Sequence, residues 1–64
     1  MQLLSNYLSG PAEVRVAEVY VTESGVYYTR FCELDYPECW KTYDSLDVAE
    51  EQAEDWVLGE LNFY

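Results

Sequence analysis

The chain has 64 residues, of which 13 are Asp or Glu and three are Lys or Arg, and it contains no His, so its formal charge is -10. Half of the residues are hydrophobic and 17% are aromatic. This is more buriable surface than acidic disordered segments contain, so we expect a folded domain. Direct binding to nucleic acid is not expected, because three dispersed basic residues cannot neutralise a phosphate backbone.

The length predicts one small domain over residues 1–64, with room for a single core. No apolar run approaches the roughly 20 residues that span a bilayer. The opening segment Met1–Leu4 lacks the basic residues and the long apolar stretch of a secretory signal. We therefore expect a cytoplasmic protein without a membrane segment. It should be a monomer or a weak dimer, because chains of this charge repel one another.

The first predicted element is a short N-terminal helix. Leu3, Leu4, Tyr7 and Leu8 are spaced at i, i+1, i+4 and i+5, and Gly10–Pro11 follows as a helix stop.

Three strands are predicted next, over residues 13–22, 25–34 and 38–43, which are rich in β-branched and aromatic side chains. Thr22–Gly25 forms a turn between the first two, and Asp35–Pro37 interrupts the chain before the third. The pattern is typical of a three-stranded antiparallel sheet.

The second turn leaves two strand registers open. A symmetric loop would pair Glu33 with Glu38 and Arg30 with Lys41, which opposes like charges. A one-residue shift or a bulge would instead set Arg30 opposite Trp40.

The two cysteines, Cys32 and Cys39, match neither a CxxC redox motif nor a four-ligand zinc site. They form either a disulfide or a pair of buried thiols, and the expected cytoplasmic location favours the thiols.

The last predicted element is a helix over residues 45–60, capped by Asp44 or Ser45 and frayed or ended at Gly59. Its apolar positions recur at steps of three and four residues and define one face. They are Leu46, Ala49, Ala53, Trp56, Val57 and Leu61. The predicted fold class is α+β: a short N-terminal helix, a three-stranded antiparallel sheet and a C-terminal helix packed on one face.

The opposite face of this helix carries five carboxylates that form one continuous acidic stripe. The acidic stripe consists of Asp47, Glu50, Glu51, Glu54 and Asp55. The helix contains no Lys or Arg that could neutralise them. Further acids are predicted to extend the negative field across the sheet. They are Glu13, Glu18, Glu23, Glu33, Asp35 and Glu38. Such a field attracts a basic partner, although a solvated acidic face can also serve solubility alone.

The chain holds more aromatic residues than one sheet face and one helix can cover, so some must be exposed. Tyr27 and Tyr28 are adjacent in a strand and must point to opposite faces. Tyr36 is predicted in a turn, and Trp40 in the last strand. Tyr36 and Trp40 are therefore candidates for short-range contacts with a partner.

Catalysis is not expected, because the chain lacks His and a nucleophile motif such as GxSxG. Carboxylate pairs such as Glu50 and Glu54 do not have EF-hand spacing. The sequence therefore predicts no enzyme activity, no cofactor and no metal site.

The small size, the acidity and the order of elements ending in the acidic helix from Ser45 to Glu60 resemble small acidic phage-encoded inhibitors, including anti-CRISPR proteins and other DNA mimics. The stretch WKTYDSLDVAEEQAEDWV, residues 40–57, also resembles the final strand and helix of small β3α DNA-binding modules such as integrase arm-binding domains. In those modules an aromatic precedes the helix and alanines line its inner face. They have basic strands, which this chain lacks, so the resemblance implies a similar fold with an inverted function.

These observations predict a non-enzymatic inhibitor of phage type that blocks a basic, nucleic-acid-binding surface of a host protein by DNA mimicry. The acidic stripe would supply long-range attraction, and Tyr36 and Trp40 would supply short-range contacts. The alternative is a general protein-interaction or accessory domain that uses an aromatic sheet face, with acidity serving only solubility.

Overall fold

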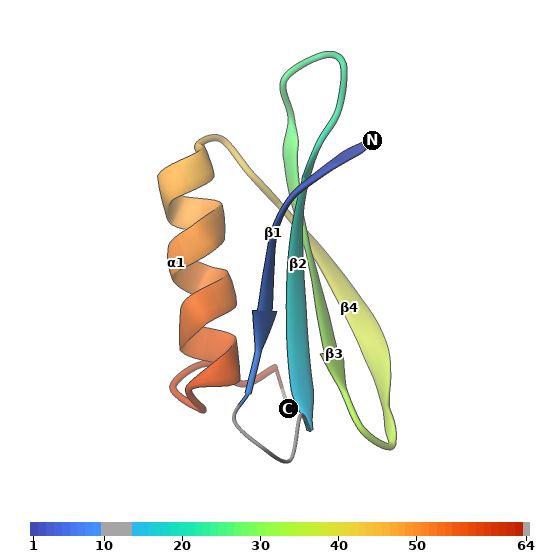
Figure 1. The fold of residues 1–64 in the computed structure, drawn as a ribbon, viewed down its shortest axis with the longest axis vertical. Coiled ribbons are helices and arrows are strands. Elements are labelled where there is room, and N and C mark those ends of the chain that lie inside the picture. The colour runs from blue at the N-terminus through green and yellow to red at the C-terminus, as the bar shows by residue number, and fades with distance from the viewer. Residues whose placement is uncertain (10–13, 64) are drawn as a thin grey trace.

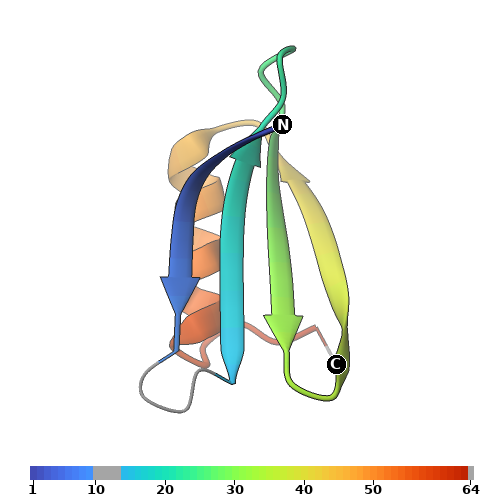
Figure 2. The ribbon, with the colours of Figure 1, turned by 45° about the vertical axis from the view of Figure 1, so that its right-hand side comes forward.

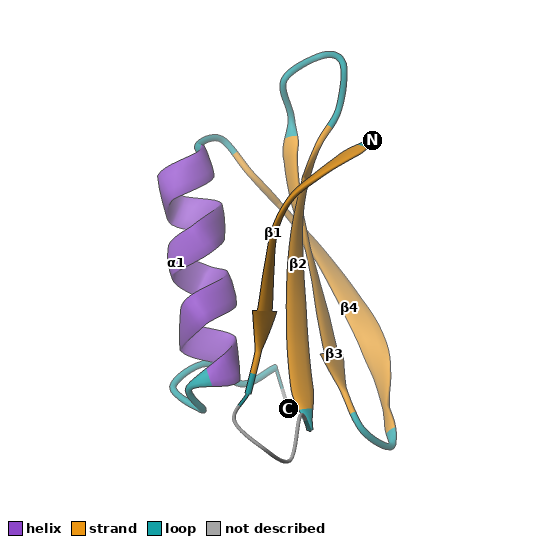
Figure 3. Ribbon diagram, in the orientation of Figure 1, coloured by secondary structure: helices purple, strands orange, loops and turns teal. Residues whose placement is uncertain are grey.

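The structure is a computed structural model that describes residues 1–9 and 14–63. These residues form four strands followed by one helix (Figures 1 and 3). The elements are β1 (Gln2–Leu8), β2 (Arg15–Val21), β3 (Tyr27–Glu33), β4 (Tyr36–Tyr43) and α1 (Leu46–Val57). Within the described residues, no helix is long and apolar enough to cross a membrane.

The strands form one antiparallel sheet in the order β1-β2-β3-β4, so each strand pairs with its neighbour in sequence. Helix α1 packs on one face of this sheet and runs behind β1 and β2 in the view of Figure 2. No other described element covers the opposite face, which we call the open face. The fold class is thus α+β, a four-stranded sheet with one C-terminal helix.

The predictions of an N-terminal helix and of a three-stranded sheet are wrong, because residues 2–8 form β1, the fourth strand of the sheet. A short apolar run of this length fits both the 3.6-residue period of a helix and the two-residue period of a strand, and Ser5 and Asn6 favour a helix only weakly. Pairing with β2 decides the outcome by satisfying the backbone groups on the outer edge of that strand. The expected stop at Gly10–Pro11 lies outside the described residues.

A bulge in β1 determines which of its side chains face the helix. Leu3 pairs with Tyr20 and Ser5 pairs with Val19, so Leu4 is an extra residue in β1. Ser5 consequently points toward α1, whereas Leu3 lies on the open face with Tyr20.

The predicted turn at Thr22–Gly25 is confirmed, and it connects β2 to β3. Gly25 has a φ of 85°, and its N–H donates to the Thr22 carbonyl at 3.0 Å. Thr22 Oγ1 accepts a hydrogen bond from the Val26 N–H at 3.1 Å. A glycine accommodates this left-handed conformation without a steric penalty.

Of the two registers left open for the second hairpin, the shifted one is observed, with Arg30 opposite Trp40. The register slips again toward the turn, because Phe31 pairs with Cys39 while Glu33 pairs with Tyr36. Pro37 lies in this irregular part of the edge strand β4, where its missing N–H leaves no ladder bond unmade.

The predicted C-terminal helix is confirmed, with Ser45 as its cap, but it ends at Val57 and does not reach Glu60. Ser45 has an extended backbone, and its hydroxyl accepts a hydrogen bond from the Val48 N–H at 3.3 Å. Asp47 lies in the first turn, near the positive end of the helix dipole. Gly59, with a φ of 83°, follows directly after the C-cap residue Leu58.

The core lies between α1 and the helix-facing side chains of the central strands. Its fully or almost fully buried residues are Ala17, Val19, Thr29, Phe31, Ala49, Ala53 and Trp56. Three helix residues in this set match the predicted apolar face, and Leu46, Val57 and Leu61 pack against the core from its edge. The buried alanines allow the helix backbone to approach the sheet closely.

Cys32 and Cys39 are free thiols. Cys39 pairs with Phe31 and packs against the core, whereas Cys32 pairs with Val16 on the open face. The sheet separates the two sulfur atoms, so an intramolecular disulfide would require the strand to be rotated. Burial raises the pKa of the Cys32 thiol.

Candidate functional site

The acidic stripe lies on α1, on the side turned away from the sheet. Asp47, Glu51 and Glu54 are exposed, and Glu50 and Asp55 are half-buried at its flanks. This arrangement follows from the helix period, because Ala49, Ala53 and Trp56 occupy the opposite side and are buried in the core. The stripe predicted from the spacing is therefore present, with three of its five acidic residues exposed.

Glu50 has a structural contact that its neighbours in the stripe lack. Its carboxylate accepts a hydrogen bond from the hydroxyl of Ser5 and so joins α1 to β1. Tyr7 lies next to this pair, and its pKa is raised by burial and by the negative charges of Glu50 and Glu54. Glu50 thus has a role in holding the fold as well as a place in the acidic stripe.

The three cations of the chain all interact on the sheet side of the molecule or at the end of the core. Arg30 forms ion pairs with Glu18 at 2.7 Å and with Glu38 at 2.6 Å. Arg15 pairs with Glu33 at 3.3 Å, and Lys41 lies over the ring of Phe63 with its Nζ 5.2 Å from the centroid. Among the described residues, no ion pair involves the acidic stripe.

The uncompensated charge is concentrated at the helix. Residues 44–60 contain seven acidic side chains and no Lys or Arg, so they carry -7 of the formal charge of -10. The seven are Asp44, Asp47, Glu50, Glu51, Glu54, Asp55 and Glu60. The molecule therefore has a strongly acidic helix layer and a sheet layer whose charges are largely paired.

The expected extension of the negative field across the sheet holds only in part. Glu18, Glu33 and Glu38 form ion pairs with the two arginines, so only one of these three negative charges remains uncompensated. The hydrogen bond from Arg30 lowers the pKa of Glu38, and a bond from the Trp40 indole adds to this. Glu13 lies outside the described residues.

Tyr36 and Trp40 do not lie beside the acidic stripe. Trp40 is on the open face, where its ring centroid is 5.6 Å from that of Tyr20 and 6.5 Å from that of Tyr28. Tyr36 is exposed at the start of β4, a strand residue and not the turn residue that was predicted. Helix α1 covers the other side of the sheet (Figure 1). The acidic stripe on α1 and Trp40 on the open face therefore lie on opposite sides of the molecule. One flat partner surface cannot contact both.

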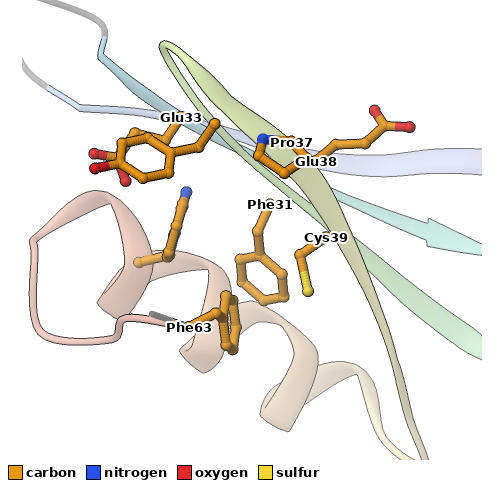
Figure 4. Close-up of a pocket in the computed structure, with 8 residues that line it drawn as sticks. Phe31, Glu33, Pro37, Glu38, Cys39 and Phe63 are labelled. Atoms are coloured by element: carbon orange, nitrogen blue, oxygen red, sulfur yellow. The ribbon is translucent and has the colours of Figure 1, made fainter.

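A small apolar pocket of about 220 Å³ lies between β4 and the segment that follows α1. The side chains of Phe31, Cys39 and Phe63 point toward one another in it, while the Glu38 carboxylate points away (Figure 4). Phe63 stacks on Trp56 with centroids 5.3 Å apart. Nothing in the sequence pattern indicated this pocket, because Phe63 reaches the core only when the chain turns back after Gly59.

Within residues 1–9 and 14–63, no three His, Cys, Asp or Glu side chains come together as a metal site would require. The geometry therefore consists of an acidic surface on the helix, a sheet whose charges are mostly paired and a small apolar pocket. Comparison with protein-family models, with curated proteins and with solved structures finds no match to this chain.

Proposed function

We propose that this protein is a non-enzymatic inhibitor of the kind that phages encode, acting in the cytoplasm of the host. Its acidic stripe binds a basic, nucleic-acid-binding surface of a host protein and blocks it by mimicking nucleic acid. The observation that carries the proposal is the acidic stripe, which has no ion pair to a described cation while all three cations of the chain interact elsewhere.

The charge density of the acidic stripe supports this assignment. Five carboxylates over nine residues at a rise of about 1.5 Å place one charge per roughly 2.7 Å of helix axis, against about 1.7 Å in duplex DNA. A rigid helix holds these charges in a fixed row. A partner with Lys and Arg side chains arranged to contact phosphates can therefore contact the carboxylates instead.

The distribution of charge favours this function over acidity for solubility alone. Solubility is achieved by charges of both signs spread over the surface. Here the arginines neutralise sheet carboxylates, and the excess charge remains on the helix side. A field of one sign on one side of a molecule accelerates association with an oppositely charged surface.

The proposal is tested by capture and displacement. The immobilised protein is exposed to the fraction of a host lysate that binds heparin, and retained proteins are eluted with increasing NaCl. A captured protein is then mixed with its DNA and titrated with the free inhibitor. We expect salt-dependent capture and displacement of the DNA; capture that leaves the DNA bound would contradict the proposal.

Two triple variants separate the acidic stripe from total charge. The stripe variant combines Asp47→Asn, Glu51→Gln and Glu54→Gln, and leaves the Glu50 contact with Ser5 intact. The control variant combines Glu23→Gln, Asp35→Asn and Glu60→Gln, which removes the same three charges from positions off the stripe. The stripe variant should lose displacement while the control retains most of it. Equal loss in both would show that net charge alone drives the binding.

A further inference from the structure

The open face of the sheet is an apolar and aromatic surface that no described element covers (Figure 2). Its side chains follow from the strand register, which places every second residue of β2 and β3 on this side. The residues are Leu3, Asn6, Leu8, Val16, Glu18, Tyr20, Tyr28, Arg30, Cys32, Glu38, Trp40 and Thr42. Leu3 is 48% exposed, Leu8 51% and Trp40 40%.

The charged residues of the open face, Glu18, Arg30 and Glu38, are all joined by hydrogen bonds in one cluster. Arg30 lies between Glu18 and Glu38 and binds both, and the Trp40 indole donates to Glu38 at 3.2 Å. The open face therefore carries a formal charge of -1, against -7 in residues 44–60. It is the part of the surface where a second copy of a strongly acidic chain meets the least repulsion.

We infer that the open face binds a second copy of this chain, and that the protein forms a sheet-to-sheet dimer about a twofold axis. Facing sheets pack about 10 Å apart. The acidic helix layers then lie on the two outer sides of the dimer. They are separated by more than about 20 Å, well beyond the Debye length of about 8 Å at physiological salt.

Arg30 makes the open face self-complementary. Its Nε and Nη1 bind Glu38 and Glu18, while its Nη2 has no partner among the described residues. Each cluster thus offers one unused guanidinium nitrogen and one excess carboxylate. A twofold axis near Arg30 sets the nitrogen of one copy against the carboxylate of the other, which is the reciprocity that an isologous interface requires.

The size of the open face predicts a weak dimer. Seven-residue strands at about 3.3 Å per residue, in four rows about 4.8 Å apart, give a projected area of roughly 440 Å² per copy. Stable interfaces bury about 800 Å² per partner. We therefore expect dissociation in the micromolar range or above, with little loss at high salt because aromatic contacts dominate.

The two tryptophans provide the test. Trp40 lies on the open face, and Trp56 is buried in the core. In a dilution series followed by NMR, the indole N–H signal of Trp40 should move with protein concentration while that of Trp56 stays fixed. Sedimentation velocity on the same samples should show a monomer and dimer in exchange. A monomer at every concentration up to about 1 mM would overturn the inference.

Charged variants locate the interface. Trp40→Glu and Leu3→Glu each place a carboxylate on the open face, and each should weaken dimerisation at least about tenfold by opposing like charges across the axis. Val48→Glu adds the same charge at an exposed position of α1, on the other side of the sheet from the open face, and should leave the dimer unchanged. Circular dichroism confirms that each variant is folded. Equal effects in all three variants would contradict the assignment.

Dimerisation through the open face and partner binding by the acidic stripe can be tested independently. The variant with Asp47→Asn, Glu51→Gln and Glu54→Gln should dimerise at least as well as the wild type. If the wild type is monomeric and Trp40→Glu abolishes capture of a host protein, the open face belongs to that protein and the dimer is refuted.

Discussion

At the scale of single residues, Arg15 connects distant parts of the chain. Its Nη1 donates to the carbonyls of Trp56 and Leu61, both at 3.0 Å, and its Nη2 donates to Asn62 Oδ1. Its guanidinium carbon also lies 4.2 Å from the centroid of the Trp56 ring. One side chain therefore binds carbonyls at the end of the helix and in the segment that follows it, and holds this terminal segment against the core.

Arg15→Lys should be costly for stability. A lysine ammonium cannot reach two carbonyls, an amide and Glu33 from one position, so we expect a loss of about 2 kcal/mol in the free energy of unfolding. Urea denaturation checks this. The matched change is Arg30→Lys, at a more exposed ion pair, which should cost clearly less. An equal or larger loss for Arg30→Lys would contradict this account of Arg15.

Three tyrosines predict how stability depends on alkaline pH. Burial raises the pKa of Tyr7, Tyr20 and Tyr43 above the ordinary value of 10.0. For a group whose pKa is raised on folding, the contribution to stability is complete below the unfolded pKa and is lost as pH rises through the folded one. We expect stability to fall above about pH 10, and phenol absorbance should show a late-titrating set of tyrosines. Simultaneous ionisation of all tyrosines in the folded protein would be inconsistent with this.

The sequence predicts some of these residue positions and not others. The acidic stripe could be predicted because helix spacing alone places its members on one side. The bond between Ser5 and Glu50 could not, since the two residues are 45 positions apart and meet only after the sheet has formed. The pairing of sheet carboxylates with arginines was missed for the same reason.

At the scale of elements, α1 and β1 depend on each other. The prediction of an N-terminal helix was wrong because the apolar spacing of residues 2–8 also fits a bulged strand. The local sequence does not show that β2 has an open edge with which this segment can pair. The C-terminal helix was predictable because its apolar pattern extends over several turns. A serine at its start and a glycine after its end also indicate a helix in this segment. The sequence left two registers open for the second hairpin, and the observed one is the shifted register, which avoids placing Arg30 opposite Lys41.

The contact between β1 and α1 gives a prediction with a neighbouring control. Glu50→Ala removes the acceptor for Ser5 and should lower the free energy of unfolding by about 1 kcal/mol. Glu51→Ala, one residue further on the exposed side, should change it by less than about 0.5 kcal/mol. Chemical denaturation of both variants at one salt concentration measures the difference. If the two variants are equally stable, the hydrogen bond does not hold β1 to the helix.

At the scale of the whole molecule, charge and apolar surface are segregated on opposite sides. Helix α1 and the open face lie on opposite sides of the molecule (Figures 1 and 2). The helix carries the acidic stripe, whereas the open face carries the ion pairs of Arg30 with Glu18 and Glu38. We propose that the acidic side binds a basic partner and that the open face binds a second copy. The dimer would present an acidic helix on each outer side.

This segregation predicts that salt stabilises the fold. The carboxylates of residues 44–60 repel one another without compensation from a cation in that segment. Raising NaCl from about 10 mM to about 500 mM should increase the free energy of unfolding by about 1 kcal/mol through screening. Urea is the appropriate denaturant, because guanidinium is itself a salt. The stripe variant should respond less than the wild type, and a decrease in stability with salt would contradict this prediction.

The central claim is that the acidic stripe, and not the net charge, recognises a basic surface. Its most direct test is the association rate constant with the captured host protein, measured by stopped flow over a range of ionic strength. The wild type and the control triple variant should associate fast at low salt and slow steeply as salt rises, whereas the stripe variant should associate more slowly and with a flatter dependence. Identical rates and identical salt dependence for the two triple variants would contradict the claim.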